Sequence, residues 1–493
     1  MMHSMVWRVF FLVLITATPS TMGSVQPVHC RIIELDVTTQ GTLFGGVKGE
    51  KEKCVCKPLI NGTESDDMLA IDLPDGMELD CADKSDDQGG VSIYISNATV
   101  SSNIVTVHPG ATISFLDPPE RRELSESRTH GRKSILMLRV STLDSEPVTT
   151  ATEFEERVFG ALSLTMTSQY ERCSFGKLTF ELAFGGAIDL VVPKNITEYQ
   201  TKLELINAVQ EEARARLQVV TLSDSADHLM MCLPPGLEGD WVAFAGVGDW
   251  RSFYSSHYCG IISVSMHEMG HNLGLRHSNE NGDYLDSSGY MGAARDNEVG
   301  PIKCFNAEKN WHLGWYKDRA IQIDPIADGP QLIELAAFVD YDKAKDNQYV
   351  LINVGNRYFL QFNRAKGPNF QTEEKRDMVT IVEHVQSNES SEMLAGLHPT
   401  SKPLHYIIDE FGNGYVFQVC QQILSDDESK PDIMIVSIGI ETSQCGDPSD
   451  FQEMLANVPR WKSVVNKRQE HVSKGDVMLG SRNSGNKRRR VRG

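Results

Sequence analysis

The stretch HEMGHNLGLRH, residues 267–277, combines three histidines, a glutamate and two glycines at a regular spacing. Residues four apart on an α-helix lie on one face, so His267 and His271 can direct their imidazole rings to one point. Gly274 lacks a Cβ atom and can adopt a positive φ, which would end the helix and turn the chain back. That turn would bring His277 to the same point. We therefore expect three imidazole ligands around one metal ion.

The pattern H-E-x-x-H-x-x-G-x-x-H is typical of zinc peptidases. A catalytic zinc ion keeps three protein ligands and leaves the fourth position to a water molecule, whose pKa falls to roughly 7. Glu268 directly follows the first histidine, so we expect it to take the proton of that water. The alternative, a surface helix with ordinary polar residues, does not account for the spacing.

Met291 lies in the stretch DYLDSSGYMGAARD, residues 283–296. The Ser-Gly pair shortly before it favours a turn. One group of zinc peptidases places a methionine in a tight turn beneath the metal ligands. Because the chain has 18 methionines, an accidental placement is the alternative. We expect Met291 to support the metal site from below.

Composition limits the choice of function. A chain of 493 residues is long enough for about three domains. The formal net charge of −20 argues against a general attraction to nucleic acid or anionic membranes. The segment KRRRVRG, residues 487–493, breaks this pattern and is also typical of a nuclear or nucleic-acid-binding segment. We favour a disordered tail over residues 456–493 that binds acidic polysaccharide or is trimmed.

The first residues of the sequence indicate secretion. An apolar run, VFFLVLITA at residues 9–17, follows Arg8 and precedes small and polar residues. It is too short to cross a bilayer, and the sequence has no apolar run of membrane-spanning length. Residues 1–24 are therefore expected to be a signal peptide. Four N-glycosylation sequons agree with an extracellular location, and they begin at Asn61, Asn97, Asn195 and Asn388.

Residues 25–133 are expected to form a β-rich unit that ends in a basic linker. Residues 91–100 and 103–117 alternate apolar and polar side chains and are rich in Val, Ile and Thr. Residues 120–134 are polar and basic without strand signals, which is typical of an exposed linker open to proteolysis. Cleavage there would release an inhibitory proregion. The alternative is an ordinary interdomain linker.

Ten cysteines in a secreted chain are expected to form disulfides. Four of them lie in residues 30–81 and six in residues 173–445, so two separately bridged units are possible, with the pairing left open. Cys54 or Cys56 could instead hold zinc as a thiolate and block it until the proregion is removed. The even number of cysteines favours disulfides over this thiolate switch.

Residues 134–318 have the signals of an α/β domain. Residues 135–143 indicate a buried strand, and further strands are expected at LTFELAF, AIDLVVP, HLMMCLP and WVAFAGV. Apolar side chains recur at helical spacing across residues 154–170, behind a capping box of Thr152 and Glu155, which predicts a helix there.

Two more helices and a closing segment complete this domain. A helix is expected to open at Thr197 and to continue to about residue 217, and the histidine-bearing helix should begin near Ile262. The segment CFNAEKNWHLGWY, residues 304–316, closes the domain. Its His312 is a weak candidate for a fourth ligand, because three ligands are already supplied.

Residues 319–455 have a β character. Val-, Ile- and Tyr-rich runs alternate with Gly, Pro, Asn and Asp, and EFGNGYV contains an Asn-Gly turn that is typical of a hairpin. We expect a small β-sandwich without a catalytic constellation of its own, acting in substrate docking or as structural support.

The chain resembles the gametolysin family of metzincin peptidases over roughly residues 134–385. The resemblance rests on six segments, HEMGHNLGLRH (267–277), GYMG (289–292), CFNAEKNWHLGWY (304–316), LRVSTLDS (138–145), QYERCSFGKL (169–178) and FNRAKGPNF (362–370). It implies a secreted zinc endopeptidase made as a zymogen, with extracellular or cell-wall glycoproteins as substrates.

Position by position, the resemblance implies that His267, His271 and His277 bind one zinc ion, that Glu268 is the catalytic base and that Met291 is the Met-turn residue. Some members have Gln at the first ligand position, and the histidine present here favours zinc. The proregion lacks the Pro-Arg-Cys-Gly segment of matrixins, so the resemblance leaves the latency mechanism open.

These observations together predict an α/β metzincin-like catalytic domain, a twisted mixed sheet plus helices, between a β-rich proregion and a β-sandwich-like C-terminal domain. The expected partner is a protein substrate. Nucleic acid and a transmembrane segment are not expected, and the oligomeric state is open. The alternative function is a secreted matrix-binding or adhesion protein with a remnant metalloprotease domain. Remnants commonly lose a ligand or the base, whereas all four groups are present here.

Overall fold

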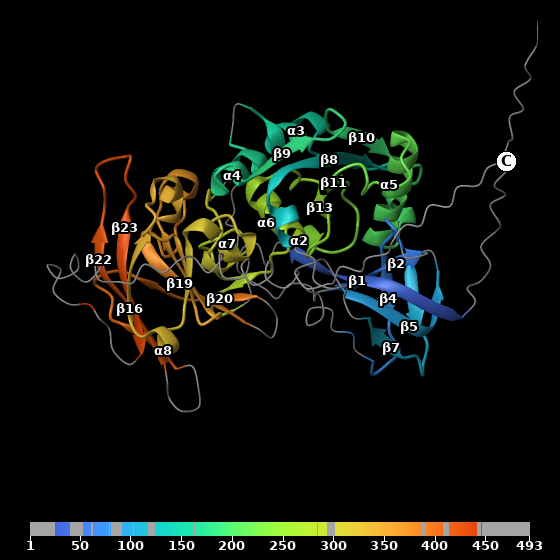
Figure 1. Cartoon of the computed structure of the whole chain (residues 1–493). Helices are drawn as coiled ribbons and strands as arrows, with labels where there is room; N and C mark the ends of the chain where they lie inside the picture. Colours follow the sequence, from blue (N-terminus) through green and yellow to red (C-terminus); the bar gives the residue numbers. More distant parts are fainter. Residues whose placement is uncertain are drawn as a thin grey trace, which may run out of the picture.

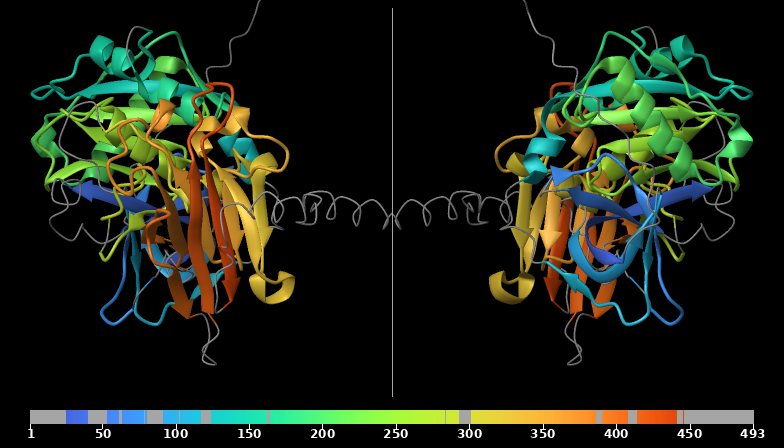
Figure 2. Two further views of the ribbon diagram at one scale, coloured as in Figure 1. Left: turned by 90° about the vertical axis from the view of Figure 1, so that its left-hand side faces the viewer. Right: turned by 90° about the vertical axis from the view of Figure 1, so that its right-hand side faces the viewer.

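The computed structural model describes residues 25–39, 53–60, 63–77, 79, 91–101, 103–116, 124–161, 164–282, 284–292, 301–385, 390–407, 414–440 and 445. Its strands and helices form an N-terminal, a central and a C-terminal region (Figure 1). The C-terminal sheets and the N-terminal strands lie at opposite ends of the molecule (Figure 1). Figure 2 shows the C-terminal sheets in front in its left view and the N-terminal strands in front in its right view. The expected signal peptide, the C-terminal tail, Asn413 of the Asn-Gly turn, Asn61 and Asn388 lie outside the described residues. The strands before and after that turn pair antiparallel, with Ile407 opposite Gly414, which confirms the expected hairpin.

The central region contains a mixed sheet. Its strands are β8 (Gly131–Ser141), β9 (Leu178–Leu182), β10 (Ile188–Val191), β11 (His228–Leu233), β12 (Trp241–Gly246) and β13 (Arg251–Ser255). They lie in the order β10-β8-β11-β13-β12, and β9 also pairs with β8. These neighbours are parallel, except that β12 runs antiparallel to β13. The expected buried strand, residues 135–143, lies largely in β8, where residues 135–138 and Val140 are buried. The side chains of β11 are buried on both faces of the sheet.

The central region also contains helices. They are α2 (Leu124–Thr129), α3 (Ala151–Phe159), α4 (Met166–Cys173), α5 (Lys202–Leu217), α6 (Ile262–Asn272) and α7 (Ala307–Leu313), with one 3-10 turn, η1 (Ile196–Glu198). Of these helices, α3, α4, α5 and α6 contact the central sheet. The start of α6 at Ile262 confirms the prediction for the histidine-bearing helix. Within the described residues, no helix is long and apolar enough to span a membrane.

Two helix predictions were wrong in detail. The capping box of α3 consists of Thr150 and Glu153, because the Thr150 hydroxyl accepts the Glu153 N–H and the Glu153 carboxylate accepts the Thr150 N–H. The expected pair, Thr152 and Glu155, lies two residues too late. The predicted helix across residues 154–170 is in fact two helices, because the chain is not helical at Gly160 and at residues 161, 164 and 165.

The helix expected from Thr197 is also shorter than predicted. Thr197 lies in the 3-10 turn η1, and α5 begins only after Thr201. The Thr201 side chain accepts the backbone N–H of Glu204, which caps the new helix.

The N-terminal region is β-rich, as predicted. Its strands are β1 (Gln26–Thr39), β2 (Lys53–Ile60), β3 (Thr63–Glu64), β4 (Leu69–Asp72), β5 (Val91–Val100), β6 (Ile104–Val107) and β7 (Ile113–Phe115). The long strand β1 pairs antiparallel with β2 and β5 and also with β12 of the central sheet. The N-terminal strands therefore continue the central sheet, and Figure 1 shows β1 reaching from one region into the other.

The expected linker over residues 120–134 is ordered in its second half. Helix α2 begins at Leu124, and β8 begins at Gly131 and pairs with β9 from that residue onward. The prediction of a strand-free linker up to residue 134 was therefore wrong, because backbone pairing with β9 extends the strand beyond its apolar stretch. The basic pair Arg121 and Arg122 lies outside the described residues.

The C-terminal region contains two sheets. One has the order β14-β20-β19-β18-β17-β15 and the other β16-β23-β22-β21. The strands are β14 (Ser278–Asn279), β15 (Ala320–Ile323), β16 (Gln331–Ala336), β17 (Leu351–Val354), β18 (Tyr358–Asn363), β19 (Met378–His384), β20 (Ser391–Leu397), β21 (Leu404–Ile407), β22 (Gly414–Ile423) and β23 (Ile433–Ile440). Short helical segments connect them, namely η2 (Lys317–Arg319), α8 (Pro325–Asp328), η3 (Phe338–Lys343) and η4 (Gly367–Asn369).

The two C-terminal sheets pack against each other through aromatic side chains. The ring of Tyr358 on β18 lies 5.9 Å from that of Tyr415 and 5.8 Å from that of Phe417 on β22. The same hydrophobic cluster continues into the central region through buried Trp315 and Tyr316. The C-terminal region therefore shares its core with the central one and is not a separately packed unit.

Disulfides follow the division expected from the sequence. One bridge, Cys30–Cys56, lies in the N-terminal region. Three bridges lie later in the chain, namely Cys173–Cys304, Cys232–Cys259 and Cys420–Cys445. Cys54 is also disulfide-bonded, and the structure has no free cysteine among its described residues.

Candidate metal centre

The three histidines of the sequence motif converge. Residues His267 and His271 lie on α6, and Gly274 adopts a φ of +94°, as predicted, so that the chain turns back after the helix. This turn places His277 beside the other two rings, and the candidate ligand nitrogens of the three residues all lie within 4.8 Å of one another. The three rings are buried. The local geometry that the spacing predicted is therefore present.

Hydrogen bonds fix the orientation of two of the rings. Nδ1 of His267 lies 2.7 Å from the carbonyl oxygen of Tyr290, and Nδ1 of His271 lies 2.8 Å from that of Leu275. A carbonyl oxygen can only accept, so each Nδ1 carries a proton and each Nε2 carries a lone pair. The two Nε2 atoms lie 3.1 Å apart. Two facing lone pairs repel each other unless a cation lies between them, and the donor set therefore fits a metal ion such as zinc.

Electrostatics keep these rings in the form that binds metal. Burial lowers the pKa of His267 well below its ordinary value, and burial also lowers the pKa of His271 to about 4. Both imidazoles are therefore neutral at pH 7. Metal binding requires the neutral form of imidazole.

Glu268 lies on the same helix and is fully buried. Its Oε1 accepts a hydrogen bond of 3.1 Å from the hydroxyl of Thr38. Burial raises the pKa of Glu268 well above its ordinary value, and the negative charge of Asp36 adds to this effect. A carboxyl group with a raised pKa beside a metal site has the properties of a general acid and base.

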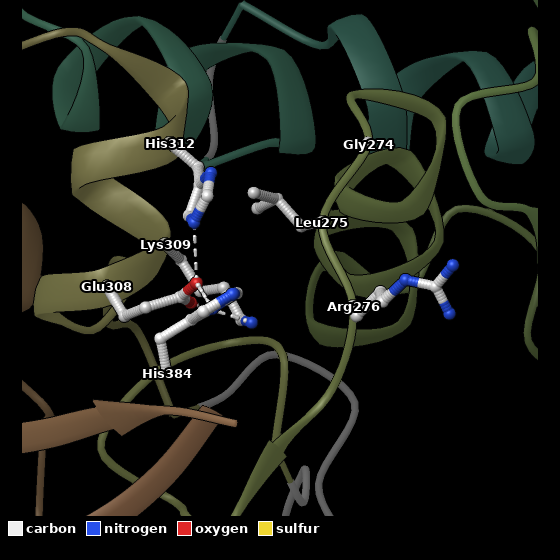
Figure 3. Close-up of a pocket in the computed structure, with 7 residues that line it drawn as sticks. All are labelled: Gly274, Leu275, Arg276, Glu308, Lys309, His312 and His384. Atoms are coloured by element: carbon white, nitrogen blue, oxygen red, sulfur yellow. Dashed lines mark hydrogen bonds and ion pairs between the residues drawn. The ribbon is translucent and has the colours of Figure 1, made fainter. Parts of the chain in front are cut away.

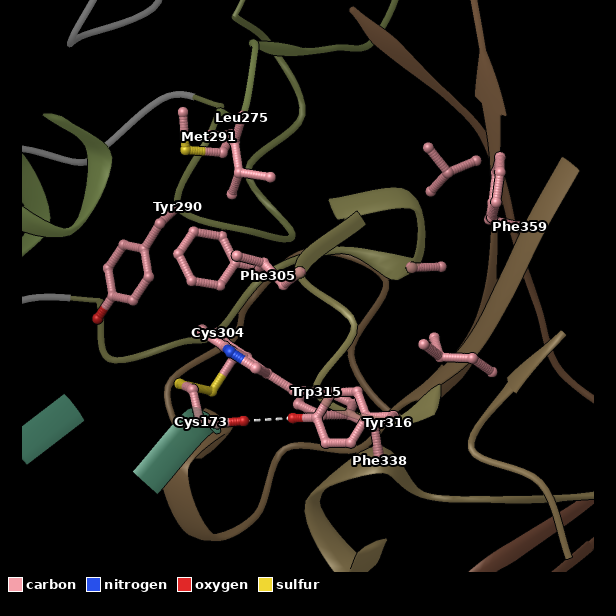
Figure 4. Packing of buried hydrophobic residues seen from close by; sticks show 14 of the residues in the cluster. Cys173, Leu275, Tyr290, Met291, Cys304, Phe305, Trp315, Tyr316, Phe338 and Phe359 are labelled. Carbon is pink, nitrogen blue, oxygen red and sulfur yellow. Dashed lines mark hydrogen bonds between the residues drawn. A yellow bond between two sulfur atoms is a disulfide. The ribbon is translucent and has the colours of Figure 1, made fainter. Parts of the chain in front are cut away.

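Met291 packs directly beneath the histidine-bearing helix. A Cβ atom built on Gly270 would overlap the Met291 sulfur, so the methionine side chain fills the space that this glycine leaves. Figure 4 shows Met291 beside Tyr290, Leu275 and Phe305, in the buried cluster that supports the site. The carbonyl of Tyr290, which orients His267, belongs to the same turn.

Residues that the sequence did not single out complete the site. Asp36 and Thr38 reach it from β1, and Oδ2 of Asp36 lies 2.8 Å from Nε2 of His277 and 3.6 Å from Nε2 of His271. The Tyr284 hydroxyl donates a hydrogen bond of 3.0 Å to Oδ1 of Asp36. No local signal marks Asp36, because an acidic residue in an alternating strand is ordinarily a solvated one.

Two candidates from the sequence lie elsewhere. Cys56 is bonded to Cys30 and Cys54 is also in a disulfide, which confirms the favoured disulfides and excludes the alternative of a thiolate ligand. An oxidised sulfur cannot act as a thiolate ligand. His312 lies with Glu308 and His384 in a separate group of possible ligands.

A helix that presents two histidines and a glutamate, with a third histidine after a glycine turn, is the arrangement typical of metal-dependent peptidases. Residues 133–352 match the model of the gametolysin peptidase M11 family. No curated protein matches the chain. This match supports a peptidase, which implies a protein substrate.

Proposed function

We propose that the protein is a secreted zinc-dependent endopeptidase with a metzincin-like catalytic domain, made as a zymogen. The observation that supports this proposal most strongly is that His267, His271 and His277 converge beside the buried carboxyl group of Glu268. By the family resemblance, its substrates are glycoproteins of the extracellular matrix or cell wall. The disulfides of the described residues agree with an oxidising compartment.

Each residue of the site has a role in peptide hydrolysis. Zinc, when bound, supplies a Lewis acid that polarises the scissile carbonyl and lowers the pKa of water. His267, His271 and His277 would hold it, with Met291 supporting their helix. Glu268 would take a proton from the attacking water and then pass it to the nitrogen of the leaving amine.

The zymogen proposal is supported by the position of β1. This strand pairs with the edge strand β12, with Asp36 opposite Ala245 and Thr38 opposite Ala243. An extended peptide binds a protein by adding a strand to such an edge. A substrate could use the edge of β12 only after β1 has left it. We therefore propose that the N-terminal strands β1 to β7, within the expected unit of residues 25–133, belong to a proregion that ends before β8 begins at Gly131.

The alternative is a secreted adhesion protein with a remnant peptidase domain. Such a remnant would commonly have lost a metal ligand or the catalytic base. In the described site, the three histidines and Glu268 are all present. The same site in a remnant would bind zinc without turnover.

Casein digestion separates the two functions. Secreted protein freed of its N-terminal unit is expected to degrade casein, to lose this activity in a chelator and to regain it when zinc is added, because the site depends on the ion. Protein left with the N-terminal unit in place serves as the control and should be much less active. If the processed protein binds zinc but does not digest casein, the result would favour the adhesion function.

A further inference from the structure

We propose that Asp36 keeps the peptidase latent, because its carboxylate occupies the ligand position that water and substrate need. This inference rests on the proposed function. Three histidines leave one position of a tetrahedral zinc open, and a carboxylate oxygen is a suitable fourth ligand. Oδ2 of Asp36 lies 2.8 Å from Nε2 of His277 and 3.6 Å from Nε2 of His271. The side chain of Asp36 is only 4% exposed, so its carboxylate is buried at this site.

The surrounding contacts hold Asp36 in place. Tyr284 donates its hydroxyl hydrogen to the second oxygen of the carboxylate, Oδ1, at 3.0 Å. Strand β1 is hydrogen-bonded to β12 on one side and to β2 on the other, and the Cys30–Cys56 bridge joins β1 to β2. A side chain on a strand held in this way loses little further entropy when it binds a metal ion.

The same strand also engages the catalytic base. Thr38, two residues after Asp36 and therefore on the same face of β1, donates a hydrogen bond of 3.1 Å to Glu268 Oε1. Strand β1 therefore contacts both the histidines that would bind the metal ion and the catalytic base, Glu268. Glu34, on the same face, forms an ion pair with Arg276, the residue directly before His277. Each of these contacts is lost when the N-terminal unit leaves.

Asp36→Asn and Asp36→Ala in the full-length, uncleaved chain test this role. The first readout is the affinity for acetohydroxamate, a small zinc ligand, measured by calorimetry on zinc-loaded protein. The two variants are expected to bind it at least about tenfold more tightly than the unchanged chain, because a tethered carboxylate no longer competes. Cleavage of a short peptide should rise in parallel. Asp72→Asn, an exposed carboxyl group on β4, is the matched control and should remain latent.

The results distinguish a failure of the role given to Asp36 from a failure of the proposed peptidase function. Equal hydroxamate affinity and equal latency in the unchanged chain and both Asp36 variants would overturn the role of Asp36, provided that processed protein is active. Inactive processed protein would overturn the proposed function instead. Asp36→Asn keeps the shape of the side chain, so a loss of folding in Asp36→Ala alone leaves the test intact.

A second group of ligand-type residues, independent of Asp36, lies behind the catalytic motif. Glu308 and His312, four apart on α7, meet His384 at the end of β19, and their ligand atoms all lie within 4.8 Å of one another. Oε1 of Glu308 lies 2.7 Å from Nε2 of His312 and 3.1 Å from Nδ1 of His384. Figure 3 shows both rings directed at this carboxylate from different elements.

We infer that Glu308, His312 and His384 form a second, structural zinc site. Two imidazole nitrogens and one carboxylate oxygen are a suitable donor set for zinc. Tetrahedral ligand atoms on bonds of about 2.1 Å lie roughly 3.4 Å apart, so an ion would have to separate Glu308 from His312 and His384, which lie 2.7 and 3.1 Å from it. A cavity of about 20 Å³ adjoins these side chains, which is room for one ion or water molecule. Nζ of Lys309 lies 2.8 Å from the other oxygen of Glu308, Oε2. Oε1 is therefore the oxygen that faces the two histidines.

The position of this group indicates what an ion there would do. The cavity is also lined by residues 274–276, the turn between the second and third catalytic histidines. An ion bound to α7 and β19 would therefore fix the C-terminal sheet against that turn. Ser391, paired with His384 across β19 and β20, also donates its backbone N–H to the carbonyl of His277. The C-terminal region would in this way support the catalytic site.

Metal content tests the second site. The full-length chain dialysed against micromolar zinc is expected to retain two zinc ions per chain, and the double variant His312→Gln, His384→Gln is expected to retain one. Addition of zinc should raise the thermal midpoint of the chelated parent protein more than that of the double variant. His257→Gln, an exposed histidine, is the control and should match the parent protein. Equal zinc content in the double variant and the parent protein would show a hydrogen-bonded cluster without an ion and would overturn this inference.

Discussion

Glu268→Gln in the processed protein is expected to lower kcat/KM for peptide hydrolysis by about 10²–10⁴-fold, the usual contribution of a general acid and base. Glutamine has nearly the same shape and can still accept the hydrogen bond that Thr38 donates in the zymogen. It cannot take a proton from water. The three histidines are unchanged, so zinc content and the thermal midpoint should stay close to those of the parent protein.

The control for this experiment is Glu171→Gln, an exposed glutamate on α4. It should retain the parent kcat/KM. Zinc-loaded Glu268→Gln protein with near-parental turnover would contradict the assigned role of this carboxylate. Loss of zinc together with activity would mean that Glu268 holds the metal site together and does not simply move a proton.

Asp249→Asn is expected to destabilise the protein strongly. Oδ2 of Asp249 lies 2.8 Å from Nε of Arg251, whose side chain is completely buried, and Oδ1 lies 3.4 Å from Nζ of Lys57 in the N-terminal unit. Removing one partner of a buried ion pair leaves an uncompensated charge and costs about 3–5 kcal/mol. The backbone N–H of Gly248, beside Asp249, also donates to the carbonyl of His271. We therefore expect the loss of stability to reach the histidine-bearing helix.

Thermal unfolding of the full-length chain measures this effect. A Glu268→Gln background prevents self-digestion, and in it Asp249→Asn should lower the midpoint by on the order of 10 °C. The matched control is Asp189→Asn, whose carboxylate lies 3.1 Å from Arg139 Nη1 but is 61% exposed. An exposed ion pair contributes at most about 1 kcal/mol, so the control should shift the midpoint by only a few degrees. Equal shifts in the two variants would contradict the importance of the buried network.

The local part of the metal site could be predicted from the sequence because helix geometry determines it. The spacing of His267 and His271 needs only a helix, and the turn to His277 needs only a positive φ at Gly274, which the structure has. The capping box of α3 was misplaced by two residues, because Thr150 and Thr152 offer the same side chain and the local pattern does not decide between them.

Contacts between distant segments could not be predicted in this way. Asp36 reaches the metal site because β1 pairs with β12, and the register of that pairing depends on tertiary packing. The group of Glu308 and His384 likewise forms only when β19 packs against α7. The sequence pattern predicted strands in both regions, yet it contained no information about which strand edges would meet.

The most direct test of the metal site is a crystal structure of the zinc-loaded, full-length chain, with data collected at the zinc absorption edge. We expect an anomalous peak within bonding distance of Nε2 of His267, His271 and His277. A fully loaded protein with its zinc bound elsewhere, or with these three rings turned away from a common point, would contradict it.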